Sequence, residues 1–184
     1  MLDLAHPRDL LMTAAIFGIA AFVWSGWAQE QPPTGWVWRA VLAVLGLLGV
    51  AMAALAIPAA VRRWSSPTAM RFDSGAWRVY VVVVAIEVVA CVALAVWANI
   101  ANRSDLIAPL ILAVVGIHFL PLAAVFGQPI MAWAGGALTV VAVVAALVPA
   151  SDTARSFWCG IVGAPIFLIA GGVCLVAGLA ELRA

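Results

Sequence analysis

Lysine is absent from this chain, and charged residues of any kind are scarce. Nine arginines and eight acidic residues make up 9% of the 184 residues, whereas a soluble domain carries about 25% charged residues. A water-facing surface needs far more charge than this, so a soluble fold is excluded. The net charge is +1 and no basic tract is present, so the sequence predicts no nucleic-acid partner.

The sequence also lacks the usual motifs of catalysis and of metal or cofactor binding. Its three cysteines are an odd number, and two of them lie well inside apolar runs, where a thiol behaves as a small hydrophobic group. There is no HExxH motif, P-loop or pair of aspartates, and the polar segments are too short to hold a catalytic site outside the membrane. His6 precedes the first apolar run and His118 lies within the fourth, which excludes haem binding by two imidazoles. We therefore expect no enzymatic activity, no metal and no cofactor.

Long apolar runs dominate the rest of the chain, which is 67% hydrophobic. A hydrocarbon core about 30 Å thick requires about 20 residues of helix, and six runs reach that length. They lie near residues 10–29, 36–61, 77–100, 106–126, 129–149 and 157–180. The sequence thus predicts an all-α membrane protein, in which residues 1–184 form one bundle of six transmembrane helices.

The distribution of arginine predicts the orientation of this bundle. Cytoplasmic flanks of membrane proteins retain positive charge. Six arginines fall on the side of the N-terminus and three on the other: Arg8, Arg62, Arg63, Arg71, Arg78 and Arg183 against Arg39, Arg103 and Arg155. We expect both termini in the cytoplasm. Tryptophans near the ends of the runs are typical of the aromatic belts at the two interfaces.

The loops and small residues predict part of the packing. The link between the fourth and fifth runs is so short that the two should be antiparallel neighbours, unless one of them is tilted or partly re-entrant. Small residues four positions apart, such as Gly135 and Thr139, favour close helix contacts. Three spans followed by three more also raise the hypothesis of an inverted repeat, since prolines precede both the second and the fifth run.

Glu87 and His118 are the two ionisable residues placed deep in predicted spans. Glu87 is ten residues from both Trp77 and Trp97, about 15 Å below the latter at about 1.5 Å per residue, and His118 is about 18 Å below Leu106. A central charged residue costs about 2.5–3.5 kcal/mol to insert, so it usually faces the bundle interior and finds a partner. The short link between their helices favours side-by-side packing, which makes a Glu87–His118 hydrogen bond feasible.

Three further residues complete the candidate site. Tyr80 and Cys91 share a helical stripe with Glu87, and Pro121 should kink the fourth helix close to His118. A carboxyl and an imidazole that share a proton can respond to pH or to a bound cation. These residues predict a protein that binds or transports a small solute or a proton. The alternative is an accessory or scaffold protein in which the polar pair only fixes helix packing. Such a protein can also form a homo-oligomer.

Two segments carry a family resemblance. FGIAAFVWSGWAQE (17–30) and GIHFLPLAAVFG (116–127), together with the glutamate in the third run, resemble small six-helix bacterial integral membrane proteins of unassigned function. The resemblance spans most of the chain and implies a multi-pass protein of the bacterial plasma (inner) membrane, without implying an activity. The length and six spans are also similar to those of the substrate-binding subunits of energy-coupling-factor vitamin transporters. That likeness is one of architecture alone.

Overall fold

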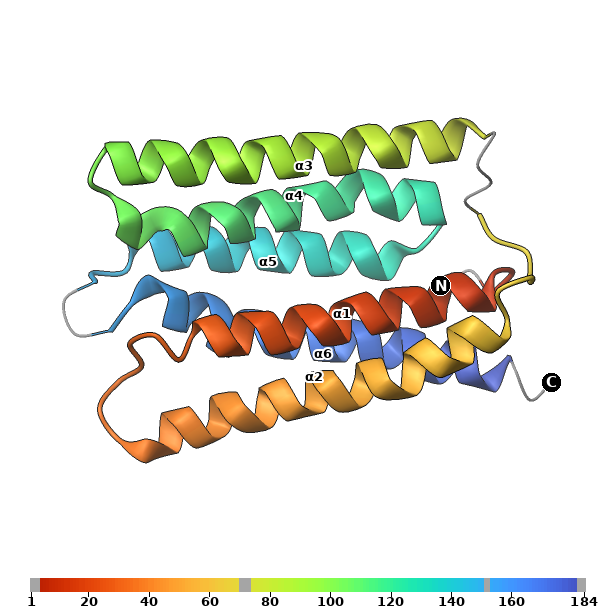
Figure 1. Ribbon diagram of the computed structural model, residues 1–184, viewed down its shortest axis with the longest axis horizontal. Helices are drawn as coiled ribbons and strands as arrows, with labels where there is room; N and C mark the ends of the chain where they lie inside the picture. The colour runs from red at the N-terminus through yellow and green to blue at the C-terminus, as the bar shows by residue number, and fades with distance from the viewer. Residues whose placement is uncertain (1–3, 70–73, 151–152, 182–184) are drawn as a thin grey trace.

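Six long helices make up the part of the protein that the structure describes. The computed structural model describes residues 4–69, 74–150 and 153–181, and within these ranges it contains no β-strand (Figure 1). The helices are α1 (Pro7–Trp27), α2 (Trp36–Arg62), α3 (Gly75–Ile100), α4 (Ile107–Phe126), α5 (Pro129–Leu147) and α6 (Arg155–Ala180), with a single 3-10 turn, η1 (Ser104–Leu106), before α4. All six are long and apolar enough to cross a membrane. The prediction of an all-α protein with six helices long and apolar enough to span a membrane is confirmed, and the predicted ends are within three residues of those observed.

The short link between α4 and α5 shows how the sequence ends one helix and begins the next. Gly127 adopts a left-handed conformation with φ +62°, which suits a residue without a Cβ. This conformation lets the backbone N–H of Gln128 donate to the carbonyl of Ala123 at 2.9 Å. Pro129 then starts α5 at a position where a helix needs no N–H donor. As predicted, α4 and α5 are antiparallel neighbours.

The helices form two groups that meet along α5 and α6. In one group α1 packs between α2 and α6, and in the other α4 packs between α3 and α5. Figure 1 shows α3, α4 and α5 above α1 and α2, with α6 behind α1; α1 begins and α6 ends at the same end of the bundle. We call this the N-terminal end. The structure also confirms that α3 and α4 are neighbours.

Glycines let the helices of the α1–α2 and α4–α5 hairpins touch backbone to backbone. A Cβ placed on Gly18 of α1 would lie 2.6 Å from the carbonyl oxygen of Gly49 of α2, and the reciprocal distance is 2.5 Å. Gly116 of α4 and Gly135 of α5 face each other in the same way, at 2.8 and 2.5 Å. The α1–α2 and α4–α5 hairpins thus share one type of contact.

Helix α3 is the exception to this close packing. Ala98 is the only buried residue in its described span, and α4 is the one helix against which it packs extensively. Its counterpart in the proposed repeat, α6, packs against both α1 and α2. The outward valines of α3, among them Val82, Val89 and Val92, are more than half exposed. Such a surface is stable only in lipid or against another apolar surface.

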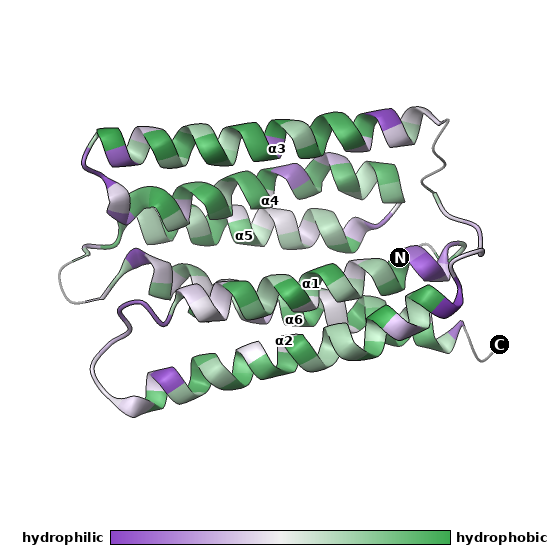
Figure 2. Ribbon diagram, viewed as in Figure 1, coloured by the Kyte–Doolittle hydropathy of each residue, from purple (hydrophilic) through white to green (hydrophobic). Residues whose placement is uncertain are grey.

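Polar residues gather at the two ends of the bundle. Figure 2 shows hydrophobic residues along the middle of the helices and hydrophilic ones mainly near their ends. Among the described arginines, Arg8, Arg62, Arg63 and Arg78 lie at the N-terminal end, and Arg39, Arg103 and Arg155 at the opposite end. Arg71 and Arg183 lie outside the described residues. The described arginines therefore separate by side as the sequence predicts.

The adjacent glycines of α5 provide a matched test of the glycine contact. We expect Gly135→Ala to lower the free energy of unfolding by about 1–3 kcal/mol, because the new Cβ would overlap the backbone of α4. Gly136 has no atom within 4 Å of the corresponding position, so Gly136→Ala should be neutral or stabilising by up to about 1 kcal/mol. Thermal unfolding in detergent micelles measures both variants. Equal midpoints would show that the backbones of α4 and α5 are not in contact.

Candidate functional site

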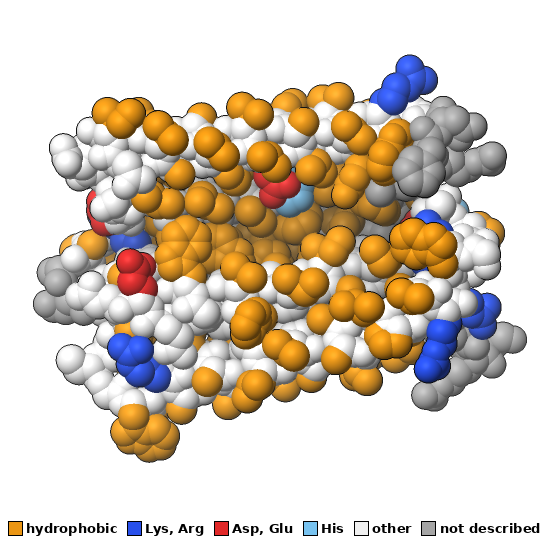
Figure 3. All heavy atoms as spheres, viewed as in Figure 1, with side chains coloured by type: hydrophobic (Ala, Val, Ile, Leu, Met, Phe, Trp, Pro, Cys, Tyr) orange, Lys and Arg blue, Asp and Glu red, His pale blue; other side chains and the backbone are white. Residues whose placement is uncertain are grey.

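A groove of about 1000 Å³ lies between α1 on one side and α3 and α4 on the other. It follows from the limited packing of α3, since α1 and α3 do not pack extensively against each other. Figure 3 shows a hollow with a hydrophobic floor between these helices, in which an acidic side chain and a histidine lie side by side. Glu87 and His118 both line it.

Glu87 and His118 are in contact at the middle of their helices. Oε1 of Glu87 lies 3.2 Å from Nδ1 of His118, and the two side chains are only 18% and 12% exposed. Nδ1 also lies 2.7 Å from the backbone carbonyl oxygen of Val115. A carbonyl can only accept a hydrogen bond, so Nδ1 carries the hydrogen. Nε2 is then the ring nitrogen that can gain or lose a proton, or accept a hydrogen bond from a ligand.

Three phenylalanine rings from three helices form the floor beside this pair. Phe17 of α1 meets Phe119 of α4 at 5.1 Å between ring centroids and Phe167 of α6 at 5.5 Å, both edge to face. Phe119 also lies next to the imidazole of His118, at 4.2 Å. Edge-to-face contacts stabilise aromatic clusters beyond the area they bury. The imidazole is therefore supported by a packed aromatic layer that joins both groups of helices.

Aromatic residues are concentrated along the whole groove. The chain contains nine tryptophans, seven phenylalanines and one tyrosine, and more than half of them line it: Phe17, Trp24, Trp27, Trp64, Trp77, Tyr80, Phe119, Phe126 and Phe167. Tyr80 stacks on Trp77 with 5.7 Å between centroids, toward the N-terminal end. Trp24 and Trp27 stack at 5.3 Å toward the other end. The polar pair thus lies between two groups of aromatic rings.

A cluster of polar contacts lies at the N-terminal end of the groove. Asp9 is 5% exposed, and its Oδ2 accepts hydrogen bonds from the Thr68 hydroxyl at 3.0 Å and the Ala69 backbone N–H at 2.8 Å. Arg8 donates to the carbonyl of Trp64 at 2.5 Å, and its guanidinium lies 5.1 Å from the centroid of the Trp64 ring. The start of α1 is therefore tied to residues 64–69, which follow α2.

Other polar contacts join the loops at the opposite end of the bundle. Arg155, at the start of α6, pairs with Asp105 of η1, and the hydroxyl of Ser156 donates to Glu30 at 3.0 Å. Arg39 donates to the backbone carbonyl of Gln29 at 3.1 Å. None of these residues lines the groove described above, so we assign them to holding the loops together.

The five residues predicted from the sequence fall into two sets. Glu87, His118 and Tyr80 line the groove. Cys91 is half-buried one turn from Glu87 and does not line it, and Pro121 lies in the continuous helix α4 with its side chain exposed. Sequence reasoning did not identify Asp9 as a residue of the groove. The available indication was an acid directly before the long apolar run that is predicted to begin near residue 10.

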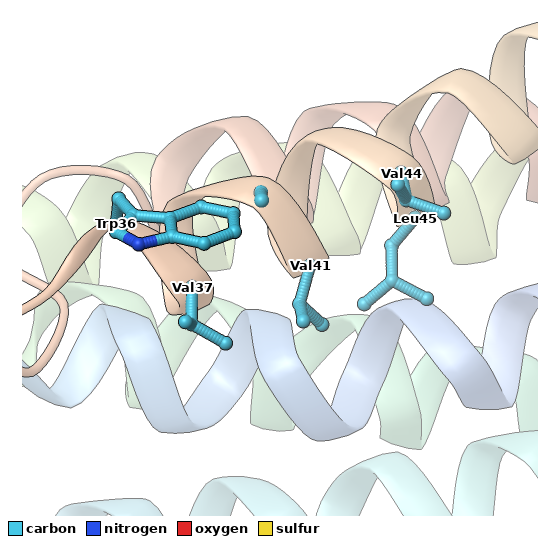
Figure 4. A pocket seen from close by; sticks show the side chains of 6 residues that line it. Trp36, Val37, Val41, Val44 and Leu45 are labelled. Carbon is cyan, nitrogen blue, oxygen red and sulfur yellow. The ribbon is translucent and has the colours of Figure 1, made fainter.

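A second hollow, of about 360 Å³, lies on the surface of α2. All six of its lining residues belong to that helix, among them Trp36, Val41 and Leu45 (Figure 4). None of its lining residues is ionisable, and none of them also lines the groove. We interpret it as part of the apolar exterior.

Neither a metal site in the described residues nor a similar protein indicates what the activity is. Within the described ranges there is no group of three or more His, Cys, Asp or Glu side chains that could hold a metal ion. No protein-family model, curated protein or solved structure matches the chain. The resemblance to small six-helix bacterial membrane proteins therefore stays a prediction.

The contact with Val115 predicts the tautomer of His118. The chain has two histidines, so a His6→Gln variant leaves one imidazole for nitrogen NMR. We expect the neutral ring to carry its hydrogen on Nδ1, because the Val115 carbonyl accepts from that atom. Glu87→Gln in the same background should leave the tautomer unchanged. A neutral ring with its hydrogen on Nε2 would contradict this geometry.

The contacts of Asp9 predict how firmly residues 64–69 are held. We expect Asp9→Ala to speed tryptic cleavage at the arginines between α2 and α3 several-fold, because the Thr68 and Ala69 hydrogen bonds to the carboxylate are lost. Gel analysis of the solubilised protein over time measures the rate. Asp105→Ala, which removes a contact at the opposite end, is the control and should not change this cleavage. Equal cleavage rates in the wild type, Asp9→Ala and Asp105→Ala would show that Asp9 does not hold residues 64–69.

Proposed function

We propose that this multi-pass membrane protein binds, and by binding transports, a small solute at the Glu87–His118 pair, with a proton as the coupled ion. One observation supports this above all: the ionisable pair at the middle of α3 and α4 lines a groove of about 1000 Å³. Ligand pockets in proteins measure about 300–1,000 Å³ and are mostly apolar, with a few polar groups that fix orientation. The groove has that composition.

The groove distinguishes this proposal from a purely structural role. A polar pair that only fixed helix packing would need no access, and filling the space around it with side chains would be more stable. Here the pair does connect α3 to α4, yet it also faces a large open space. Ionisable residues within membrane spans that face a cavity are typical of proton and solute pathways.

The chemistry of the pair supports coupling to a proton. With one titratable proton the pair is neutral, whether the proton is on the Glu87 carboxyl or on Nε2 of His118. When that proton leaves, Glu87 remains as a carboxylate, Nδ1 of His118 keeps its hydrogen toward Val115, and the site carries one negative charge. Two interacting groups of this kind titrate as a unit. A solute that interacts differently with the two states changes the proton occupancy.

We further propose that the N-terminal end of the bundle faces the cytoplasm of a bacterial cell. The arginine bias supports the orientation, and the resemblance of residues 17–30 and 116–127 to bacterial membrane proteins supports the location.

A second candidate function is that of an accessory or scaffold protein, whose partner, or second copy, covers α3. The exposed surface of α3 favours it, since Ala98 is the only residue buried in Gly75–Ile100.

Labelling with dicyclohexylcarbodiimide tests the proposal, because this apolar reagent reacts with protonated carboxyl groups that it can reach from lipid. We expect one adduct at Glu87, detected by mass spectrometry of the protein in lipid nanodiscs. Its rate of formation should fall as pH rises, since the reactive form is the acid. Glu181→Gln, which removes a glutamate outside the groove, should label normally, and Glu87→Gln should not label. An unreactive Glu87 at every pH would favour the scaffold function instead.

A further inference from the structure

We infer that the solute is a lipophilic organic cation, which enters the groove sideways from the lipid between α1 and α3. This inference rests on the proposed function and adds the chemical class of the ligand. It follows from three features of the groove: the sign of its central charge, its aromatic surfaces and the direction in which it opens.

The charges that line the groove favour a cation at its centre. The ionisable groups along it are Arg8, Asp9, Tyr80, Glu87 and His118. Arg8 and Asp9 lie close to each other, with 3.7 Å between Nε and Oδ1, and are also bonded to residues 64–69 at one end. Among the described residues, Glu87 is therefore the one acid that lines the centre of the groove, and no arginine lines that part of it. Its charge is weakly screened in apolar surroundings, so it attracts a cation and repels an anion.

The aromatic surfaces favour an organic cation over a metal ion. Rings attract cations that lie over their faces, most strongly when the cation is desolvated. Phe119 lies beside the pair, with Trp77 and Tyr80 to one side and Trp24 and Trp27 to the other. A small metal ion would need several oxygen ligands in place of its water, and the apolar lining does not supply them. An organic cation with spread charge needs no such ligands.

The shape of the groove favours entry from the membrane. At its N-terminal end, Arg8 and Asp9 are hydrogen-bonded to residues 64–69. Its long side lies between α1 and α3, which are not packed together, and Figure 3 shows the hollow from that side. A ligand that partitions into lipid can therefore reach Glu87 along this side without crossing a polar barrier.

Charge balance then couples the cation to a proton. The protonated pair is neutral, and the arrival of a monovalent cation is balanced when one proton leaves the pair. Among the described residues of the lining, Arg8 and Asp9 are engaged at the groove end, and Tyr80 is the one ionisable side chain left besides the pair. One cation and one proton therefore exclude each other from the site, which is the stoichiometry of an exchanger.

Two hydrophobic ions of nearly the same shape and opposite charge test this class of ligand. We expect tetraphenylphosphonium to bind the purified protein saturably, with one site per chain, and tetraphenylborate to show no saturable binding. Glu87→Gln should weaken phosphonium binding by about tenfold or more, given the strength of a charge pair away from water. Glu181→Gln should bind as the wild type does. Equal binding of the two ions, or full binding to Glu87→Gln, would overturn the inference.

A second pair of variants decides the question if Glu87→Gln does not fold. Trp77 lines the groove, whereas Trp133, at the same end of the bundle, does not and is half exposed. Trp77→Leu should weaken phosphonium binding several-fold, and Trp133→Leu should not.

Carbodiimide labelling separates this inference from the proposed function. If Glu87 is labelled and tetraphenylphosphonium does not slow the labelling, the cation inference fails while the proposed function stands.

Discussion

Close backbone contact is the constraint on which this bundle depends. Lipid tails are as apolar as the protein interior, so the hydrophobic effect does little to hold one membrane helix against another, and van der Waals packing must do it. Gly18 against Gly49, and Gly116 against Gly135, bring the backbones of α1 and α2, and of α4 and α5, into contact. Gly160 of α6 approaches the carbonyl of Trp24 in the same manner. Five of the six helices are joined by such contacts or by packing that extends from them.

Helix α3 lacks this means of attachment, and the candidate site results from that lack. After Gly75 it contains no glycine, and its valine-rich surface presents branched side chains that keep neighbouring backbones apart. It is joined to α4, and the Glu87–His118 contact lies on that interface. The pair therefore stabilises the one helix that packs poorly, and the space left between α3 and α1 gives access to the same pair. The same two side chains thus join α3 to α4 and face the groove.

Helix positions could be predicted from the sequence, whereas most helix neighbours could not. A run of about 20 apolar residues defines a span and the depth of a residue within it, which is why Glu87 and His118 were placed at one level. Their contact was foreseeable only because a short link joins their helices. No short link joins α1 to α6, so their contact could not be predicted in this way. In lipid every face of a helix can be apolar, so no polar face shows which side is buried. The groove, and the aromatic rings that gather in it, depend on those neighbours and became visible only in the structure.

The packing of α1 against α6 has a consequence for how the protein is made. Helices leave the ribosome in order, and α1 can pair with α2 as soon as both are inserted. The face of α1 that carries Leu11, Phe17 and Trp24 is covered by α6, the last of the six described helices to be synthesised. Until α6 arrives, that face is exposed to lipid or to other membrane proteins. Assembly of the bundle, and of the aromatic floor beside His118, is therefore completed only after synthesis of the last span.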